Sequence, residues 1–225
     1  MLKNLYVALF CTLLCVPVTV AFGQRTFSIS PMAAPTLVRT NYNRMYLYPD
    51  SDGQIVEPIF LVGTPSAFGY ATGLMGQYTY APGWSVAAGI WYSQATLRLA
   101  RPAASGEGTT AIRSRTVRIP LLLNYQPSTR RLSPYFSLGL LLDFPAASRV
   151  VVTRVGQPTQ RLRLTADAGP VFQLMLGAGG RYRINRRWAL IVQPVWAYNL
   201  GRFGGAQTYN SSYEVSILTH TTYSF

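Results

Sequence analysis

The sequence predicts an all-β fold, an eight-stranded antiparallel up-and-down transmembrane β-barrel, on three observations. Eight segments alternate apolar and polar residues with a period of two, long and short connections alternate between them, and aromatic residues recur at two heights along the expected strands. A period of two gives a strand one apolar and one polar face. A barrel that crosses a bilayer turns the apolar face outward and joins its strands by long loops at one end and short turns at the other.

The eight expected strands share this alternation and are, in chain order, residues 27–38, 70–80, 84–93, 117–125, 135–144, 171–184, 188–200 and 213–225. The first is the weakest, because Pro31 and Pro35 interrupt it and proline cannot donate a ladder hydrogen bond. The strand at 117–125 shows the clearest phase, with Val117, Ile119 and Leu121 on the outward face.

Four long connections combine polar residues with turn signals: 39–66, 101–112, 146–167 and 201–211. Three short connections carry tight-turn residues: 81–83, 127–131 and 185–187. The two kinds alternate without exception, which is the asymmetry of a membrane barrel with long outer loops. Within 146–167, the pieces Arg149–Val152 and Arg161–Leu164 alternate again and predict strands that project beyond the membrane.

The outward aromatic residues fall into two sets. Beside the short turns are Phe27, Tyr80, Trp84, Tyr125, Phe136, Tyr182, Trp188 and Tyr223. Toward the long loops are Tyr70, Tyr92, Phe144, Phe172, Tyr198 and Tyr213. A tilted strand climbs roughly 2.5 Å per residue, so the two sets lie about 20 to 25 Å apart, the height of the apolar band between two aromatic girdles.

Residues 1–23 have the features of a secretory signal peptide, with Lys3 before an apolar run and a small-x-small site at Ala21-Phe22-Gly23. We expect cleavage there and one barrel domain at residues 24–225. An uncleaved anchor is the alternative, because the apolar run approaches the roughly 20 residues that span a bilayer. Cys11 and Cys15 both lie in the signal, so we expect no disulfide in the mature protein.

The chain has nineteen arginines and one lysine against seven acids, and its net charge is +13. Such a basic chain favours an anionic partner. Because export removes the protein from the cytoplasm, we expect no nucleic acid partner and expect anionic lipid head groups instead.

The end of the sequence resembles the terminal strand of bacterial outer-membrane β-barrels, which finish on Phe with an aromatic residue two positions earlier. The matching residues here are Phe225 and Tyr223. The resemblance implies that these two residues are an assembly signal, read by the barrel-assembly machinery, and that the mature protein resides in the outer membrane.

A second resemblance covers Arg118 to Gly139, through Ile119-Pro120-Leu121-Leu122-Leu123-Asn124-Tyr125 and Pro134-Tyr135-Phe136-Ser137-Leu138-Gly139. This strand-turn-strand pattern is similar to that of the outer-membrane β-barrel domain family common in Bacteroidetes-type bacteria, with an OmpA/OmpX-like eight-stranded architecture. The resemblance implies fold and location, since that family has no single activity.

Few residues suit catalysis. His220 is the only histidine, and it lies on an inward phase near the short-turn end without a Ser or carboxylate at a telling spacing. Gly177-Ala178-Gly179-Gly180 is the nearest approach to a phosphate loop, but it lies inside a strand, where glycines make room for neighbouring side chains. We therefore expect no enzyme activity, no metal site and no cofactor.

Arg118 and Asp143 have inward phases on neighbouring strands. If the turn pairs Gln126 with Ser133, Asp143 becomes the same-face diagonal neighbour of Arg118, within reach of its long side chain. We predict an interior ion pair between them that helps to plug the barrel, with Glu214 as a further partner.

Eleven arginines fall on the long-loop side: Arg39, Arg44, Arg98, Arg101, Arg113, Arg115, Arg149, Arg154, Arg161, Arg163 and Arg202. The guanidinium group suits phosphate binding, so lipopolysaccharide phosphates are the expected ligand. The contacts we expect are Arg98, Arg101, Arg113, Arg115, Arg161 and Arg163. Ordinary solvated loop charge is the alternative.

The expected protein is thus a monomeric outer-membrane barrel with a side-chain-filled interior and a structural or surface-interaction role. Three alternatives stay open: a small pore or solute channel, a lipid A-modifying enzyme, and a soluble periplasmic barrel.

Overall fold

The computed structural model describes residues 26–47, 59–101, 108–156, 158–164, 169–202 and 211–225. The expected signal peptide lies outside these residues. The described residues form antiparallel strands: β1 (Thr26–Leu47), β2 (Ile59–Gly63), β3 (Ser66–Ala81), β4 (Trp84–Arg101), β5 (Gly108–Tyr125), β6 (Leu132–Arg154), β7 (Gln160–Leu164), β8 (Val171–Arg183), β9 (Trp188–Arg202) and β10 (Ser211–Ser224). No helix among them is long and apolar enough to cross a membrane.

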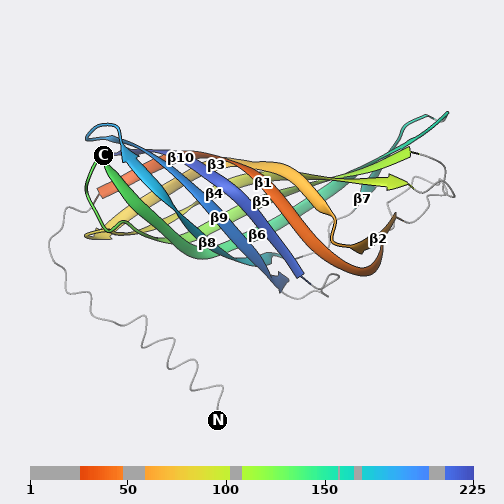
Figure 1. The fold of residues 1–225 in the computed structure, drawn as a ribbon, viewed down its shortest axis with the longest axis horizontal. Helices are drawn as coiled ribbons and strands as arrows, with labels where there is room; N and C mark the ends of the chain where they lie inside the picture. The colour runs from red at the N-terminus through yellow and green to blue at the C-terminus, as the bar shows by residue number, and fades with distance from the viewer. Residues whose placement is uncertain (1–25, 48–58, 102–107, 157, 165–168, 203–210) are drawn as a thin grey trace, which may run out of the picture.

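Eight of these strands close into a ring in the order β1-β3-β4-β5-β6-β8-β9-β10, and β10 pairs with β1. Every neighbour runs antiparallel, so the predicted up-and-down barrel is confirmed (Figure 1). The short strands β2 and β7 pair with the far ends of β1 and β6 and lie at the end opposite the C terminus. The backbone N–H of Phe225 donates to the carbonyl of Phe27 over 3.1 Å at the closing seam.

The inward and outward phases agree with the sequence pattern. Leu121 is 49% exposed on the outer face, whereas its neighbour Leu122 is 5% exposed inside. The exposed large residues of the ring include Leu74, Ile90 and Ile217, while serines, threonines and an arginine are buried. A water-soluble barrel has the reverse arrangement, so this outer face is built to contact lipid.

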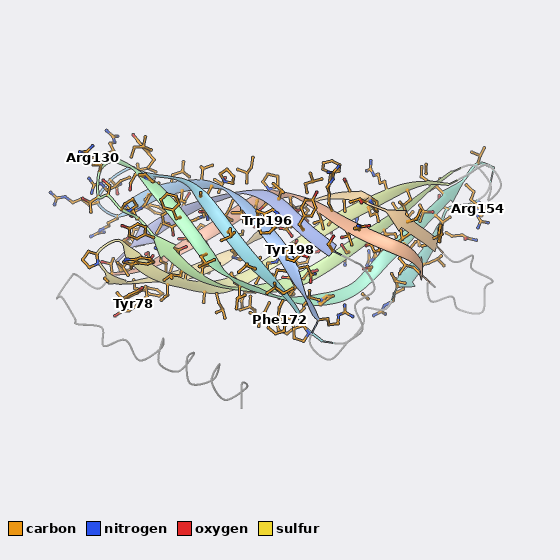
Figure 2. All side chains as sticks on the ribbon, turned by 60° about the horizontal axis from the view of Figure 1, so that its bottom comes forward. Tyr78, Arg130, Arg154, Phe172, Trp196 and Tyr198 are labelled. Atoms are coloured by element: carbon orange, nitrogen blue, oxygen red, sulfur yellow. The ribbon has the colours of Figure 1, made fainter. Side chains whose placement is uncertain are left out.

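Aromatic residues pair across strands at two levels of the outer surface. Near the short turns, Trp84 packs on Tyr125 and Trp188 on Tyr223, with ring centroids 4.6 and 4.9 Å apart. Near the other end, Tyr70 and Tyr92 are 6.5 Å apart. The two levels form the girdles that mark the membrane interfaces of such barrels. In Figure 2, Arg130 and Arg154 lie at opposite ends of the barrel, with Trp196 and Tyr198 between them.

The glycine-rich part of β8 packs closely against β9. A Cβ added to Gly179 would lie 2.5 Å from the Cα of Gln193, and one added to Gly177 would lie 3.2 Å from the Gln193 side chain. These glycines therefore make room for a buried neighbour, as the sequence predicts.

The strands extend further than the sequence indicates. β1 continues to Leu47 and pairs with β2, so the expected loop 39–66 is wrong over much of its length. β4 and β5 likewise continue into the expected loop 101–112. Beyond the membrane the outer face meets water, so polar residues that suggest a loop fit the outside of a strand. The projecting strands predicted within 146–167 are confirmed, because Val150 and Val152 of β6 pair with Leu162 and Gln160 of β7.

This projecting part, which we call the extension, has its own apolar core. Its buried members come from the four strands β2, β4, β5 and β6 and are Ile59, Leu61, Leu97, Ile112, Val150 and Val152. The extension is thus a packed continuation of the barrel.

Candidate functional site

Arg118 on β5 lies inside the barrel and holds two carboxylates. Its Nε donates to Asp143 Oδ1 over 2.6 Å and its Nη2 to Asp143 Oδ2 over 2.9 Å. Nη1 and Nη2 donate to the two oxygens of Glu214 over 3.0 and 2.9 Å. Gln173 Nε2 adds a hydrogen bond of 2.7 Å to Asp143. We call Arg118, Asp143 and Glu214 the interior triad.

The register of this hairpin differs from the expected one. Arg118 lies directly opposite Asp143, not diagonal to it, because pairing begins at Tyr125 and Phe136. Pro127 and Pro134 flank the turn. Because a proline has no backbone N–H to donate to the ladder, pairing between the two strands starts beyond both residues. The displacement is two residues, so every side chain keeps its face and the two charges still meet.

The interior triad is buried and combines two carboxyl groups with one guanidinium. The exposed fractions of the three residues lie between 3% and 7%. Asp143 and Glu214 are the only acids among the described residues, while Asp50, Asp52, Glu57, Glu107 and Asp167 lie outside them. Two carboxylates therefore share one guanidinium at the centre of the barrel.

Below the interior triad, apolar side chains fill the barrel. The buried cluster includes Met32, Met75, Trp91, Leu122, Leu141, Met175 and Leu218. The cavity between this cluster and the triad measures about 10 Å³. That is about the space one water molecule needs.

His220 lies deeper still, toward the short turns. Its ring is 3% exposed and stands 6.2 Å from that of Tyr135. Neither ring nitrogen has a hydrogen-bond partner among the described residues. His220 is therefore not part of a nucleophile-base pair in the described interior.

Six arginines gather on the outer surface of the extension, on one face of four adjacent strands. They are Arg98 of β4, Arg113 and Arg115 of β5, Arg149 of β6, and Arg161 and Arg163 of β7. They line an open depression with a volume of about 1170 Å³. We call them the arginine face. Five of them are lipopolysaccharide contacts expected from the sequence. The sixth expected contact, Arg101, ends β4, and its side chain lies outside the described residues.

Like charges oppose one another across this face. Arg113 is directly opposite Arg149, and Arg149 is directly opposite Arg163. Such pairs destabilise a sheet unless something else neutralises them. Within the described part of the chain no ion pair involves these arginines, and Arg115 Nε, shielded from solvent, has no hydrogen-bond partner.

Arg149 occupies the centre of the row but is not one of the six contacts expected from the sequence. The central position of Arg149 follows only from the pairing of its strand with both neighbours, and the sequence does not determine the strand register of the extension. The arginine face begins just above the upper girdle, since Arg115 pairs with Ala146, two residues beyond the Tyr92–Val117–Phe144 row.

Tyr223 and Phe225 lie at the closing seam. Their rings meet edge to face with centroids 5.1 Å apart, and Phe225 stacks on Phe27 at 6.2 Å. The side chains therefore join the last strand to the first.

A closed eight-stranded ring with an apolar outer belt, two aromatic girdles and a packed interior defines the bacterial outer-membrane β-barrel class. No family model matches the sequence, and no curated protein matches it. Among solved structures, the fold is similar to a major outer membrane protein from Thermus thermophilus, with a TM-score of 0.51, 12% identity, and 90% of this chain and 100% of that chain covered.

Two further solved structures align with this chain at lower similarity. Neisserial surface protein A (NspA) aligns with a TM-score of 0.49 and 13% identity, covering 90% of this chain and all of that one. The outer membrane enzyme PagL aligns with a TM-score of 0.40 and 10% identity, covering 86% of this chain and 97% of that one. Identities this low support the fold alone.

Proposed function

We propose that this outer-membrane barrel binds the phosphate groups of lipopolysaccharide through its arginine face and has a surface-interaction role, with neither a conducting pore nor an active site. The observation that carries the proposal is the row of opposed arginines, Arg113, Arg149 and Arg163. A polyanion that bridges this row would turn the repulsion into attraction, and guanidinium groups bind phosphate in a bidentate geometry.

The height of the arginine face supports lipopolysaccharide as the source of phosphate. Along β5, Arg115 lies two residues above Val117, the residue that pairs with Tyr92 and Phe144. Aromatic girdles lie at the level of the head groups. Lipid A phosphates therefore reach this face from the side, without leaving the membrane plane.

The filled interior supports the absence of a pore. The interior triad spans the lumen and the apolar cluster below it is closely packed. An eight-stranded ring is just wide enough for side chains to fill. The isolation of His220 supports the absence of catalysis.

Binding of defined lipid A species tests the proposal. The refolded barrel in nanodiscs is titrated with bis-phosphorylated and dephosphorylated lipid A at fixed ionic strength. We expect the phosphorylated lipid to bind at least about tenfold more tightly, and the R113Q/R149Q/R163Q variant to lose that preference. The matched control is R130Q/R183Q/R186Q, which removes three exposed arginines at the short-turn end.

Three results would contradict the proposal. Equal losses in both triple variants would show unspecific charge attraction. A stable conductance in planar bilayers would favour the pore, and shortened lipid A in cells that express the protein would favour the enzyme.

A further inference from the structure

The extension contains a partly open cavity of about 330 Å³ directly above the interior triad. Its floor is formed by Arg118, Asp143, Glu214 and Gln173, and its walls include Leu61, Leu97, Ile112 and Leu164. Cavities that hold small ligands measure roughly 300 to 1,000 Å³ and combine apolar walls with a few polar groups. This cavity has both features at the lower end of that size range.

The floor has two carboxyl groups for one guanidinium, a formal excess of one negative charge when both are ionised. Arg118 contributes one positive charge to two carboxylates, and no other cation is in an ion pair with them among the residues that the structure describes. A buried charge without a counterion is costly, so the site favours a group that adds a positive charge.

Anions and bare metal ions fit the cavity less well. An anion would meet a guanidinium that already donates four hydrogen bonds to Asp143 and Glu214. Ca²⁺ and Mg²⁺ need six or more oxygen ligands, some of which can be retained waters. The carboxylate oxygens of Asp143 and Glu214 already accept hydrogen bonds from Arg118, and Asp143 accepts another from Gln173, so fewer of them are free to coordinate an ion.

One wall adds an aromatic, hydroxyl-bearing side chain. Tyr42 of β1 lines the cavity, and burial raises the pKa of its hydroxyl, so the phenol stays neutral. A neutral phenol ring attracts a cation over its face and contributes apolar contact to the body of a ligand.

We propose that this cavity binds a small molecule made of a primary ammonium group on an apolar body of about ten heavy atoms. The ammonium group contacts the carboxylates of Asp143 and Glu214, and the body packs among Leu61, Leu97 and Ile112. This site lies inside the barrel, whereas the arginine face lies outside it, so the two proposals stand or fall separately.

The experiment uses three probes with the same phenyl body, 2-phenylethylamine, 2-phenylethanol and 3-phenylpropionate, and the full barrel refolded in nanodiscs. Calorimetric titration at high salt suppresses attraction to the arginine face. We expect saturable binding of the amine, binding of the alcohol weaker by about tenfold or more, and no binding of the carboxylate.

Two variants locate the binding site. Glu214→Gln neutralises the floor and should remove the preference for the amine over the alcohol. Ala95→Leu fills the cavity without touching the interior triad and should abolish saturable binding, while Ala88→Leu on the lipid face serves as its control. If Glu214→Gln does not fold, as judged by heat-modifiable migration on gels, Ala95→Leu still decides the location.

The proposal is overturned if the alcohol binds as tightly as the amine, or if Ala95→Leu binds like the wild-type protein. Amine binding that never saturates would show that the probe partitions into the lipid, and it would also overturn the proposal. Stabilisation by Ca²⁺ alone, lost in Glu214→Gln and without saturable amine binding, would assign the floor to a metal ion.

Discussion

Arg118 and Glu214 lie on strands four positions apart in a ring of eight, so their contact crosses the full width of the barrel. The guanidinium of Arg118 holds Asp143 on the adjacent strand and Glu214 on the opposite wall at once. Strands that share no backbone hydrogen bonds are thereby tied together near the upper girdle. The same contact forms the floor of the proposed ligand cavity.

Replacing Arg118 with Met should destabilise the barrel by roughly 3–5 kcal/mol, because two buried carboxylates lose their partner. The triple variant R118M/D143N/E214Q should regain much of that stability, since it leaves no unpaired charge. Denaturant titration of the folded band on gels measures both. Equal stability of R118M and the wild-type protein would show that the interior triad is not an energetic brace.

A charge in the lipid belt should be far more harmful than one in the extension. Leu121→Arg places a guanidinium on the outer face near the middle of the membrane and should cost about 2–4 kcal/mol. Thr109→Arg, exposed on the same strand beyond the membrane, is the control and should fold normally. Similar folding yields of the two variants in lipid would place the membrane elsewhere on the barrel.

The wild-type barrel should show no stable single-channel conductance in planar bilayers. The double variant W91A/M175A removes two large buried side chains below the interior triad and should produce openings, because truncation leaves connected space. A wild-type conductance as large as that of the variant would contradict the filled interior.

Phe225→Ser should reduce the amount of protein in the outer-membrane fraction much more than Ser224→Ala does. The Phe225 ring packs on Phe27 and Tyr223 at the seam, and the resemblance to other terminal strands implies that it is part of an assembly signal. Fractionation with heat-modifiable gels measures assembly. Equal outer-membrane levels of the two variants would show that Phe225 has no special role in assembly.

Arg149→Gln should stabilise the extension at low ionic strength while weakening lipid A binding. It removes the central charge of the Arg113–Arg149–Arg163 row, and relief of such a pair contributes roughly 0.2–1 kcal/mol. Hydrogen exchange of β6 and β7 with and without salt detects the change, since salt screens exposed charges. A stability gain independent of salt would point to another cause.

Much of the barrel can be predicted from the sequence, because the apolar face of each strand must point outward to the lipid. The alternation of Val117, Ile119 and Leu121 fixes which residues face outward, and an even shift of the register cannot change that. The contact between Arg118 and Asp143 follows from the same parity, although their pairing differs from the expected diagonal by two residues.

The extension is harder to read from the sequence. Above the girdle both the loop and the outer face of a strand are polar, so residues 39–47 carry no signal that separates the two. The arginine face depends on register within that part, and the central place of Arg149 follows only from its pairing with Arg113 and Arg163. The cavity above the triad depends on how β2 returns against β1, which no local pattern encodes.

The packed core of the extension also fixes how far the barrel projects above the membrane. From Phe144, at the upper girdle, β6 continues as a strand to Arg154, with one irregularity in its pairing with β5 between Ala146 and Arg149. At roughly 2.5 Å of height per residue, the strand rises about 25 Å above the head groups. Val150 and Val152 anchor this rise to neighbouring strands. The extension is therefore a packed projection whose end stands at a fixed height above the outer-membrane surface. A macromolecule approaching the cell meets that end before it meets the membrane.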